Sequence, residues 1–164
     1  MTLPPFLFGS FMNLISKILR PDNILLDTES TSKKRVFERV GLLFENNQQI
    51  SRSQVFDSLF AREKLGSTGL GHGVAIPHGR IAKLRDATAA FVKTSNPIPF
   101  DAPDGQPVNL IFVLLVPDRA NDLHLQILSE LAQMFSDTQF RNRLVASDDT
   151  PNLHHLFCDW SGKA

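Results

Sequence analysis

The segment 108–116 restricts the possible folds more than any other part of this sequence. It contains the run NLIFVLLV, in which seven of the eight residues are apolar. A strand with one face in water alternates apolar and polar side chains, so this nearly unbroken run predicts a strand covered on both faces, at the centre of a sheet. Shorter segments predicted as strands are 22–26, 74–76 and 87–94.

Two helices are predicted between the first strand and a glycine-rich region. Residues 30–32, Ser-Thr-Ser, can cap a helix over 33–46. Its core face, at helical spacing, consists of Val36, Val40, Leu43 and Phe44. The run 51–54, SRSQ, is a capping-box pattern that predicts the start of a second helix, which ends near residues 64–66.

Further helices are predicted towards both ends of the chain. Asn121 or Asp122 is expected to cap a helix that extends to about residue 135. Its inward side chains are expected to be Leu125, Leu128, Leu131, Ala132 and Phe135. Shorter helices are expected at 13–20, 138–145 and 151–160. Because helices precede and follow the strands, the predicted fold class is α+β (α/β layered), a single domain with a mixed β-sheet flanked by helices on both sides.

The composition is that of one globular domain with balanced charge. The chain has 164 residues, with 17 Lys and Arg against 17 Asp and Glu, so no global field favours nucleic acid or an anionic membrane as partner. Its single cysteine, Cys158, cannot form an internal disulfide or a cysteine zinc site. No apolar stretch is long enough to span a membrane. These features predict a cytoplasmic protein without membrane insertion.

The first residues do not form a convincing signal sequence. The run 3–11, LPPFLFGSF, is apolar, but no basic residue precedes it, two prolines interrupt it and no small-residue cleavage site follows. Met12 then begins an amphipathic segment. We therefore expect residues 1–11 to be a disordered extension upstream of an alternative start at Met12, and 12–164 to form the domain.

The glycine-rich region around His78 is the strongest candidate for chemistry. Five of the nine glycines lie between residues 66 and 79, where glycine lets backbone N–H groups approach an anion. His78 follows Pro77 at the predicted end of a short strand, and Gly79 leaves space beside its imidazole. A neutral imidazole is a competent nucleophile near pH 7. The alternative interpretation is a half-exposed structural histidine.

Other residues could assist such a nucleophile. His124 lies in the first turn of a predicted helix, where the helix dipole favours a neutral imidazole and nearby anions; alternatively it belongs to that helix's apolar stripe. Arg62 could bind phosphoryl oxygens or simply complement a helix C-terminus. Ser67 and Thr68 could donate hydroxyl hydrogen bonds or merely shape the turn.

Several familiar sites are not indicated. His72 is interpreted as an exposed loop residue, and the adjacent pair at 154–155 cannot share one helix face to bind a metal. The glycine-rich region lacks the Gly-Lys-Ser/Thr ending of a phosphate-binding P-loop, and the chain has no GxGxxG, HExxH or G-x-S-x-G pattern.

Taken together, these motifs resemble enzyme IIA domains of the phosphotransferase system (PTS), of the fructose/mannitol type. The resemblance rests chiefly on REKLGSTG at 62–69 and AIPHG at 75–79, and it extends from Met12 to the C-terminal helix. Further matching segments are 99–101, 106–108, 115–117, 123–125 and 128–132. Within the family the chain is most similar to the nitrogen-regulatory IIA proteins.

The resemblance implies a role for each site residue. His78 is implied to be the phosphorylated nucleophile, His124 to orient the phosphoryl group and Arg62 to bind it. Less directly, it implies a phosphate loop of Ser67, Thr68 and Gly79. Phosphoryl transfer needs positioning and charge stabilisation rather than further covalent chemistry, so we expect no metal and no cofactor.

The resemblance also implies partners. An HPr- or NPr-type phosphocarrier is expected to phosphorylate the protein, which then acts on regulatory targets such as potassium-transport regulators or sensor kinases. The first alternative is a sugar-uptake component that passes phosphate to a IIB domain for fructose or mannitol. A second alternative is a pure binding module that senses a small anion without covalent chemistry.

Overall fold

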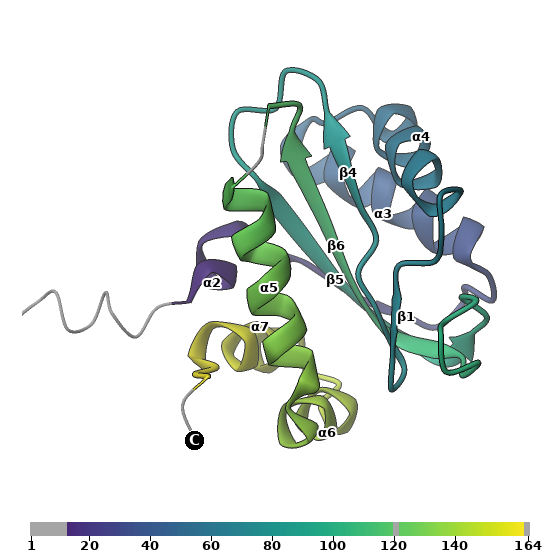
Figure 1. The fold of residues 1–164 in the computed structure, drawn as a ribbon, viewed down its shortest axis with the longest axis vertical. Helices are drawn as coiled ribbons and strands as arrows, with labels where there is room; N and C mark the ends of the chain where they lie inside the picture. The colour runs from purple at the N-terminus through teal and green to yellow at the C-terminus, as the bar shows by residue number, and fades with distance from the viewer. Residues whose placement is uncertain (1–12, 120–121, 163–164) are drawn as a thin grey trace, which may run out of the picture.

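The central strand β6 (Val108–Pro117) organises the sheet. The computed structural model describes residues 13–119 and 122–162. β6 pairs antiparallel with β5 (Thr88–Ile98), and on its other side parallel with β3 (Val74–Ala75) and β4 (His78–Ile81). The predicted central position of this strand is confirmed (Figure 1).

Within the described residues, the sheet is mixed and has six strands. β1 (Leu19–Asp27) pairs parallel with β5, and β2 (Gly69–Gly71) pairs antiparallel with β3. The resulting order is β1-β5-β6-β3-β2, with β4 beside β6 beyond β3. β1 is an edge strand, and this position tolerates Pro21, which has no N–H to donate.

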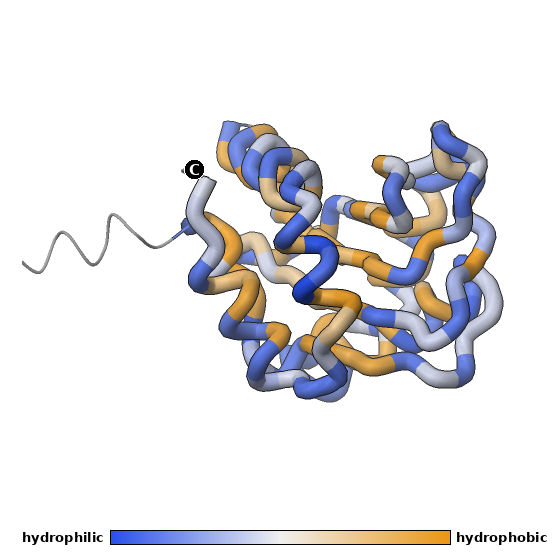
Figure 2. Tube along the Cα trace, turned by 90° about the horizontal axis from the view of Figure 1, so that it is seen from below, coloured by the Kyte–Doolittle hydropathy of each residue, from blue (hydrophilic) through white to orange (hydrophobic). Residues whose placement is uncertain are grey.

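Alternate side chains of β6 face two separate hydrophobic cores. One set joins the core beneath α2 (Leu14–Ile18), α5 (Asp122–Ser136), α6 (Thr138–Ala146) and α7 (Thr150–Asp159). That set is Leu110, Phe112, Leu114 and Val116. The other set lies beneath α3 (Lys33–Gln48) and α4 (Arg52–Glu63). It consists of Val108, Ile111, Val113 and Leu115. Figure 2 shows long hydrophobic stretches along the strands between the two helical layers, so the predicted fold class is confirmed.

The predicted caps of α3 and α4 are confirmed. The Ser32 side chain accepts a hydrogen bond from the N–H of Arg35, and that of Ser51 accepts one from Gln54. Both serines satisfy N–H groups that have no partner within the first turn.

Three predicted boundaries or faces are wrong. The first strand begins at Leu19 rather than at residue 22, and the helix before it ends at Ile18 rather than at residue 20. On α5, Leu125 is 64% exposed and Ala132 is exposed. The buried side chains of α5 are instead Ile127, Leu131, Met134 and Phe135. Leu125 is two residues from the first of these, about 200° around the helix, and therefore faces outward.

The strand at the candidate site also differs from its prediction. β3 and β4 follow one register along β6, with Ala75 opposite Ile111 and His78 opposite Leu114. Between them Pro77 has no N–H, and the N–H of Ile76 donates to the carbonyl of Thr68 at 3.0 Å. His78 therefore begins a strand instead of ending one. The predictions for Asn121 and for residues 1–11 lie outside the described residues.

The Phe157→Ala variant tests the core beneath α7. The Phe157 ring is fully buried, with its centroid 4.8 Å from Phe91, 5.5 Å from Phe112 and 5.3 Å from Phe140. Its removal should lower the free energy of unfolding by about 3–5 kcal/mol in urea titrations. The control Leu42→Ala, at a half-exposed position, should change it by under about 1 kcal/mol. Equal effects of the two variants would contradict the packing described.

Candidate functional site

The imidazole of His78 is held by its own backbone neighbourhood. His78 is the half-buried first residue of β4, and its Nδ1 lies 2.9 Å from the carbonyl oxygen of Ile76. A carbonyl oxygen can only accept, so this hydrogen bond requires a proton on Nδ1. The lone pair of the neutral ring is consequently on Nε2, which is the nitrogen able to act as a nucleophile.

His124 faces His78 from another element. It is the third residue of α5, as expected, and its ring centroid lies 5.5 Å from that of His78 with an interplanar angle of 67°. The Nε2 atom of His124 is buried and has no hydrogen-bond partner among the described residues. A buried nitrogen without a partner is costly, and a bound ligand that reaches this atom would give it one.

Both histidines are held neutral by their surroundings. Burial is the main cause that lowers the pKa of His78 below 6.5, and the nearby Arg62 cation lowers it further. The carbonyl of Ile76 and the charge of Glu63 act in the opposite direction. Burial also lowers the pKa of His124, followed by the charge that His78 carries when it is protonated and by the charge of Arg80. Two neutral imidazoles at pH 7 can provide one nucleophile and one hydrogen-bond donor.

Arg62 links α4 to the loop that follows it. It lies in the last turn of α4, and its Nη1 donates at 2.8 Å to the carbonyl of Gly66, three residues beyond the end of the helix. Its charge also contributes to the lowered pKa of His78. A basic side chain in the last turn agrees with the interpretation as a complement to the helix C-terminus, and the binding of phosphoryl oxygens stays a prediction.

The hydroxyl groups of the glycine loop (residues 66–73) are already bonded to other parts of the chain. Ser67 Oγ donates to the carbonyl of Phe100 at 2.5 Å and accepts from the N–H of Gly69 at 3.0 Å. Thr68 Oγ1 donates to Glu63 at 2.7 Å. The geometry supports the turn-shaping interpretation of both residues, and their role as phosphate donors stays a prediction.

Gly79 has a packing reason to be glycine. A Cβ atom there would lie 2.1 Å from Ser58 Oγ on α4. The same hydroxyl donates to the carbonyl of Arg80 at 2.9 Å and joins α4 to β4. This close approach fixes the helix that carries Arg62 against the strand that carries His78.

Glu63 is a site residue that the sequence did not single out. Its side chain is 4% exposed, pairs with Lys33 and accepts from both the N–H and the hydroxyl of Thr68. A glutamate between Arg62 and Lys64 at a helix end is typical of a solvated surface position. Its place at the site is recognised only from its burial, which depends on the packing of α3 against α4.

A cavity borders the outer side of His124. It has a volume of about 500 Å³ and opens between α2, the end of β6 and the start of α5. Its lining is mainly apolar and includes Leu14, Ile18, Val116, Leu123 and Ile127. His124 thus lines this cavity and also contacts His78.

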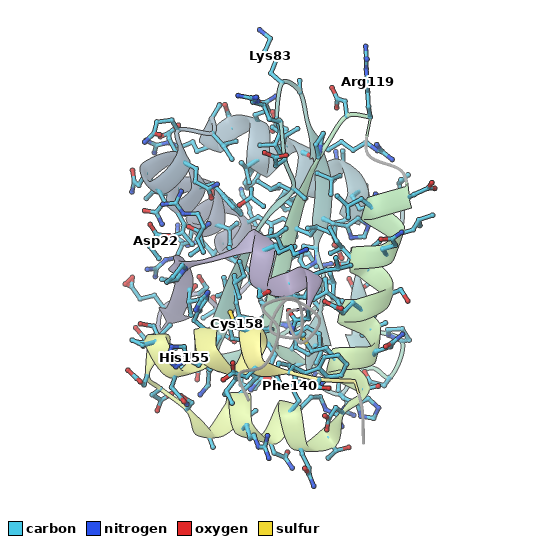
Figure 3. The ribbon with its side chains drawn as sticks, turned by 90° about the vertical axis from the view of Figure 1, so that its left-hand side faces the viewer. Asp22, Lys83, Arg119, Phe140, His155 and Cys158 are labelled. Carbon is cyan, nitrogen blue, oxygen red and sulfur yellow. The ribbon has the colours of Figure 1, made fainter. Side chains whose placement is uncertain are left out.

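The remaining histidines lie apart from this pair. His72 is exposed with a φ of 57°, and its N–H donates to Asp104 at 2.9 Å. His154 Nε2 lies 2.9 Å from the carbonyl of Leu19. Figure 3 shows His155 and Cys158 on α7, far from the end of the sheet marked by Lys83 and Arg119. Residues 13–119 and 122–162 contain no group of three His, Cys, Asp or Glu side chains arranged to hold a metal ion.

The order of elements and the run from Arg62 to Gly79 match a known family. The chain belongs to the phosphoenolpyruvate-dependent sugar phosphotransferase system EIIA 2 family, whose model matches residues 17–159. Within the described part of the chain, no helix has the length and apolar character needed to cross a bilayer.

Relatives within this family carry the name nitrogen regulatory protein. The chain is 38% identical over 146 residues to that of Pseudomonas aeruginosa, covering 88% of this chain and 95% of the relative. It is 52% identical to the crystal structure of nitrogen regulatory protein IIA-Ntr from Neisseria meningitidis, with a TM-score of 0.83, covering 88% and 99% of the two chains. The crystal structure of IIA mannitol from Escherichia coli has a TM-score of 0.70 at 20% identity, covering 85% and 98%, and shares the fold.

The lowered pKa of His78 predicts a pH dependence of stability. Below pH 6.5 the unfolded chain binds more protons at this residue than the folded protein does. The stabilisation is therefore fully present above pH 6.5 and is lost as the pH falls through the pKa of the folded state. In urea titrations, His78→Gln should show a smaller decrease in the free energy of unfolding between about pH 7 and pH 5 than wild type. An unchanged pH dependence would contradict a neutral, buried His78.

Proposed function

We propose that this protein is a phosphoryl-carrier IIA component of the nitrogen-related phosphotransferase system, phosphorylated on His78 by an HPr- or NPr-type carrier. In this function it regulates target proteins according to its phosphorylation state. The main supporting observation is the hydrogen bond from His78 Nδ1 to the carbonyl of Ile76, which leaves Nε2 unprotonated in a ring whose centroid lies 5.5 Å from that of His124.

The proposed reaction exchanges one phosphorus–nitrogen bond for another. The Nε2 lone pair of His78 attacks the phosphorus carried on a histidine nitrogen of the partner. As the new bond forms, the old one breaks, and its electron pair stays on the carrier's nitrogen. The imidazole of His78 becomes more positive, and the Ile76 carbonyl stabilises that charge through the Nδ1 proton. No net proton transfer is needed.

Three groups stabilise the charge on the transferred phosphoryl oxygens in this proposal. Arg62 provides a cation beside His78, and the N-terminus of α5 provides the positive end of a helix dipole. The buried Nε2 of His124, protonated in the corresponding tautomer, donates to a phosphoryl oxygen and gains the partner that it lacks. Such preorganised donors are the main resource for phosphoryl transfer.

Exposed apolar side chains support docking of a protein partner at this site. Leu65 is 83% exposed, Leu70 44%, Leu123 51% and Leu125 64%. They belong to the loop after α4, to β2 and to the start of α5, the elements that carry Arg62, the glycine loop and His124. Exposed apolar side chains gathered beside polar site residues are typical of protein–protein contact.

Nitrogen regulation is favoured over sugar uptake by the relatives. Nitrogen regulatory proteins of several bacteria are 35–38% identical to the chain. The alternative retains some support, because a fructose-specific EIIA component of Haloferax volcanii is 30% identical and is covered over 95% of its length. Phosphate passage from the phosphorylated protein to a purified IIB domain for fructose or mannitol would favour the sugar-uptake role.

His78→Ala tests the phosphoryl acceptor. With radiolabelled phosphoenolpyruvate, enzyme I and carrier, wild type should gain an acid-labile label and His78→Ala should gain none. Thermal unfolding serves as the control for folding. Label that persists in the variant would remove His78 from this role. A wild type that takes up no label would favour the pure binding module.

His124→Ala and Arg62→Ala separate the supporting roles. His124→Ala should still accept phosphate but pass it on more slowly, because the phosphoryl group loses its orienting donor. Arg62→Ala should slow acceptance by about tenfold to a hundredfold while the fold remains intact, since one charged donor is lost. Stopped reactions sampled over time measure both steps, and wild-type rates in either variant would refute that residue's assignment.

A further inference from the structure

Glu63 makes more polar contacts than a structural ion pair requires. Its Oε2 accepts from Lys33 Nζ at 2.9 Å and from the N–H of Thr68 at 3.0 Å. Its Oε1 accepts from the hydroxyl of Thr68 at 2.7 Å. Lys33 is 18% exposed, so little water competes for this pair. A carboxylate with three donors and almost no solvent contact holds its neighbours in one arrangement.

Thr68 connects this carboxylate to the candidate nucleophile. The carbonyl of Thr68 accepts from the N–H of Ile76 at 3.0 Å. The carbonyl of that same Ile76 accepts from His78 Nδ1 at 2.9 Å. Glu63, Thr68, Ile76 and His78 therefore form a continuous series of hydrogen bonds, which crosses the break in the strand at Pro77.

Lys33 anchors the far end of the series to the rest of the domain. Its Nζ is also 3.4 Å from the carbonyl of Phe100 and 4.6 Å from the centroid of that ring. The same carbonyl accepts from Ser67 Oγ. The glycine loop is thus tied to α3, α4 and the segment around Phe100 by charged and polar contacts.

We propose that Glu63 is a positioning residue for phosphoryl transfer, which acts through Thr68 and Ile76 to hold His78 in the Nδ1–H tautomer with Nε2 directed at the incoming phosphoryl group. This inference rests on the proposed function of His78. Glu63 itself does not touch the phosphoryl group. Its effect is on the placement of the Ile76 carbonyl, which selects the ring nitrogen that carries the proton.

A methionine removes this carboxylate without a large change in the size of the side chain. A glutamine would be a weaker test, because its oxygen could accept from the Thr68 N–H while its NH₂ group donates to the Thr68 hydroxyl, which also accepts. Glu63→Met has no oxygen acceptor for either donor of Thr68 and leaves Lys33 without its counter-charge.

The tautomer of His78 is a direct readout that a merely structural role would not change. In ¹⁵N-labelled full-length protein, long-range imidazole ¹H–¹⁵N spectra should show a single Nδ1–H tautomer for His78 in wild type. Glu63→Met should show a mixture of tautomers. Thr68→Val, which retains the Glu63–Lys33 pair and removes one contact, should shift in the same direction. An unchanged Nδ1–H tautomer in both variants would overturn the proposal.

Transfer kinetics give a second readout. Phosphorylation of Glu63→Met by phosphorylated carrier should have a kcat at least about tenfold below wild type with little change in KM, because misplacement of the acceptor slows the chemical step. The double variant Lys33→Met/Glu63→Met removes the unpaired charge. If Glu63 only neutralises Lys33, the double variant regains the wild-type kcat, and the proposal fails; a kcat that stays low supports it.

Glu45→Met is the matched control. Glu45 is likewise a carboxylate that accepts from a backbone N–H and from a cation, here both of Arg52, but it lies on α3 and outside the series. The Glu45→Met variant should retain wild-type kcat and His78 tautomer; a decrease equal to that of Glu63→Met would overturn the specific role. The spectra require no phosphorylation, so the two proposals can fail separately. If wild type never accepts phosphate but the Glu63 variant still loses the Nδ1–H tautomer, the proposed function is refuted and the role of the hydrogen-bond series in holding the tautomer stands.

Discussion

The burial of β6 on both faces is the constraint on which the rest of the structure depends. Its alternate side chains enter two cores, so neither helical layer can be removed without exposing one side of the strand. The strand also pairs on both edges, with β5 on one side and with β3 and β4 on the other. The register of β6 fixes Ala75 and His78 along one of its edges. The position of the candidate nucleophile therefore follows from the pairing of the buried strand.

Pro77 lies at the break between β3 and β4 and has no N–H to donate to β6. Beside this break the Ile76 carbonyl accepts from His78 Nδ1, and the Ile76 N–H donates to the carbonyl of Thr68. These two hydrogen bonds fix the ring nitrogen that carries the proton and attach the strand to the glycine loop. Gly79 then permits α4, with Arg62 and Glu63, to pack close to the strand.

Charge and burial at the site have a common origin in the packing of α3, α4 and α5 around the sheet. Burial keeps His78 and His124 neutral, while the charges of Arg62 and Glu63 act on the pKa of His78 in opposite directions. A neutral imidazole suits both the acceptance of a phosphoryl group and its donation, since neither step then begins with the loss of a proton. This balance depends on distances between elements that are far apart in the sequence.

The sequence by itself determined the central strand, the capped starts of α3 and α4, the layered class and the motif that shows the family. These features are local, because an apolar run, a capping serine and an ordered glycine–proline–histidine motif need no distant partner to be recognised. The pairing of β3 and β4, the outward face of Leu125, the contact between His78 and His124 and the burial of Glu63 were decided only by the tertiary structure. Each depends on which elements pack together, and a helix end such as that at Glu63 is polar in sequence whether it finally faces water or Lys33.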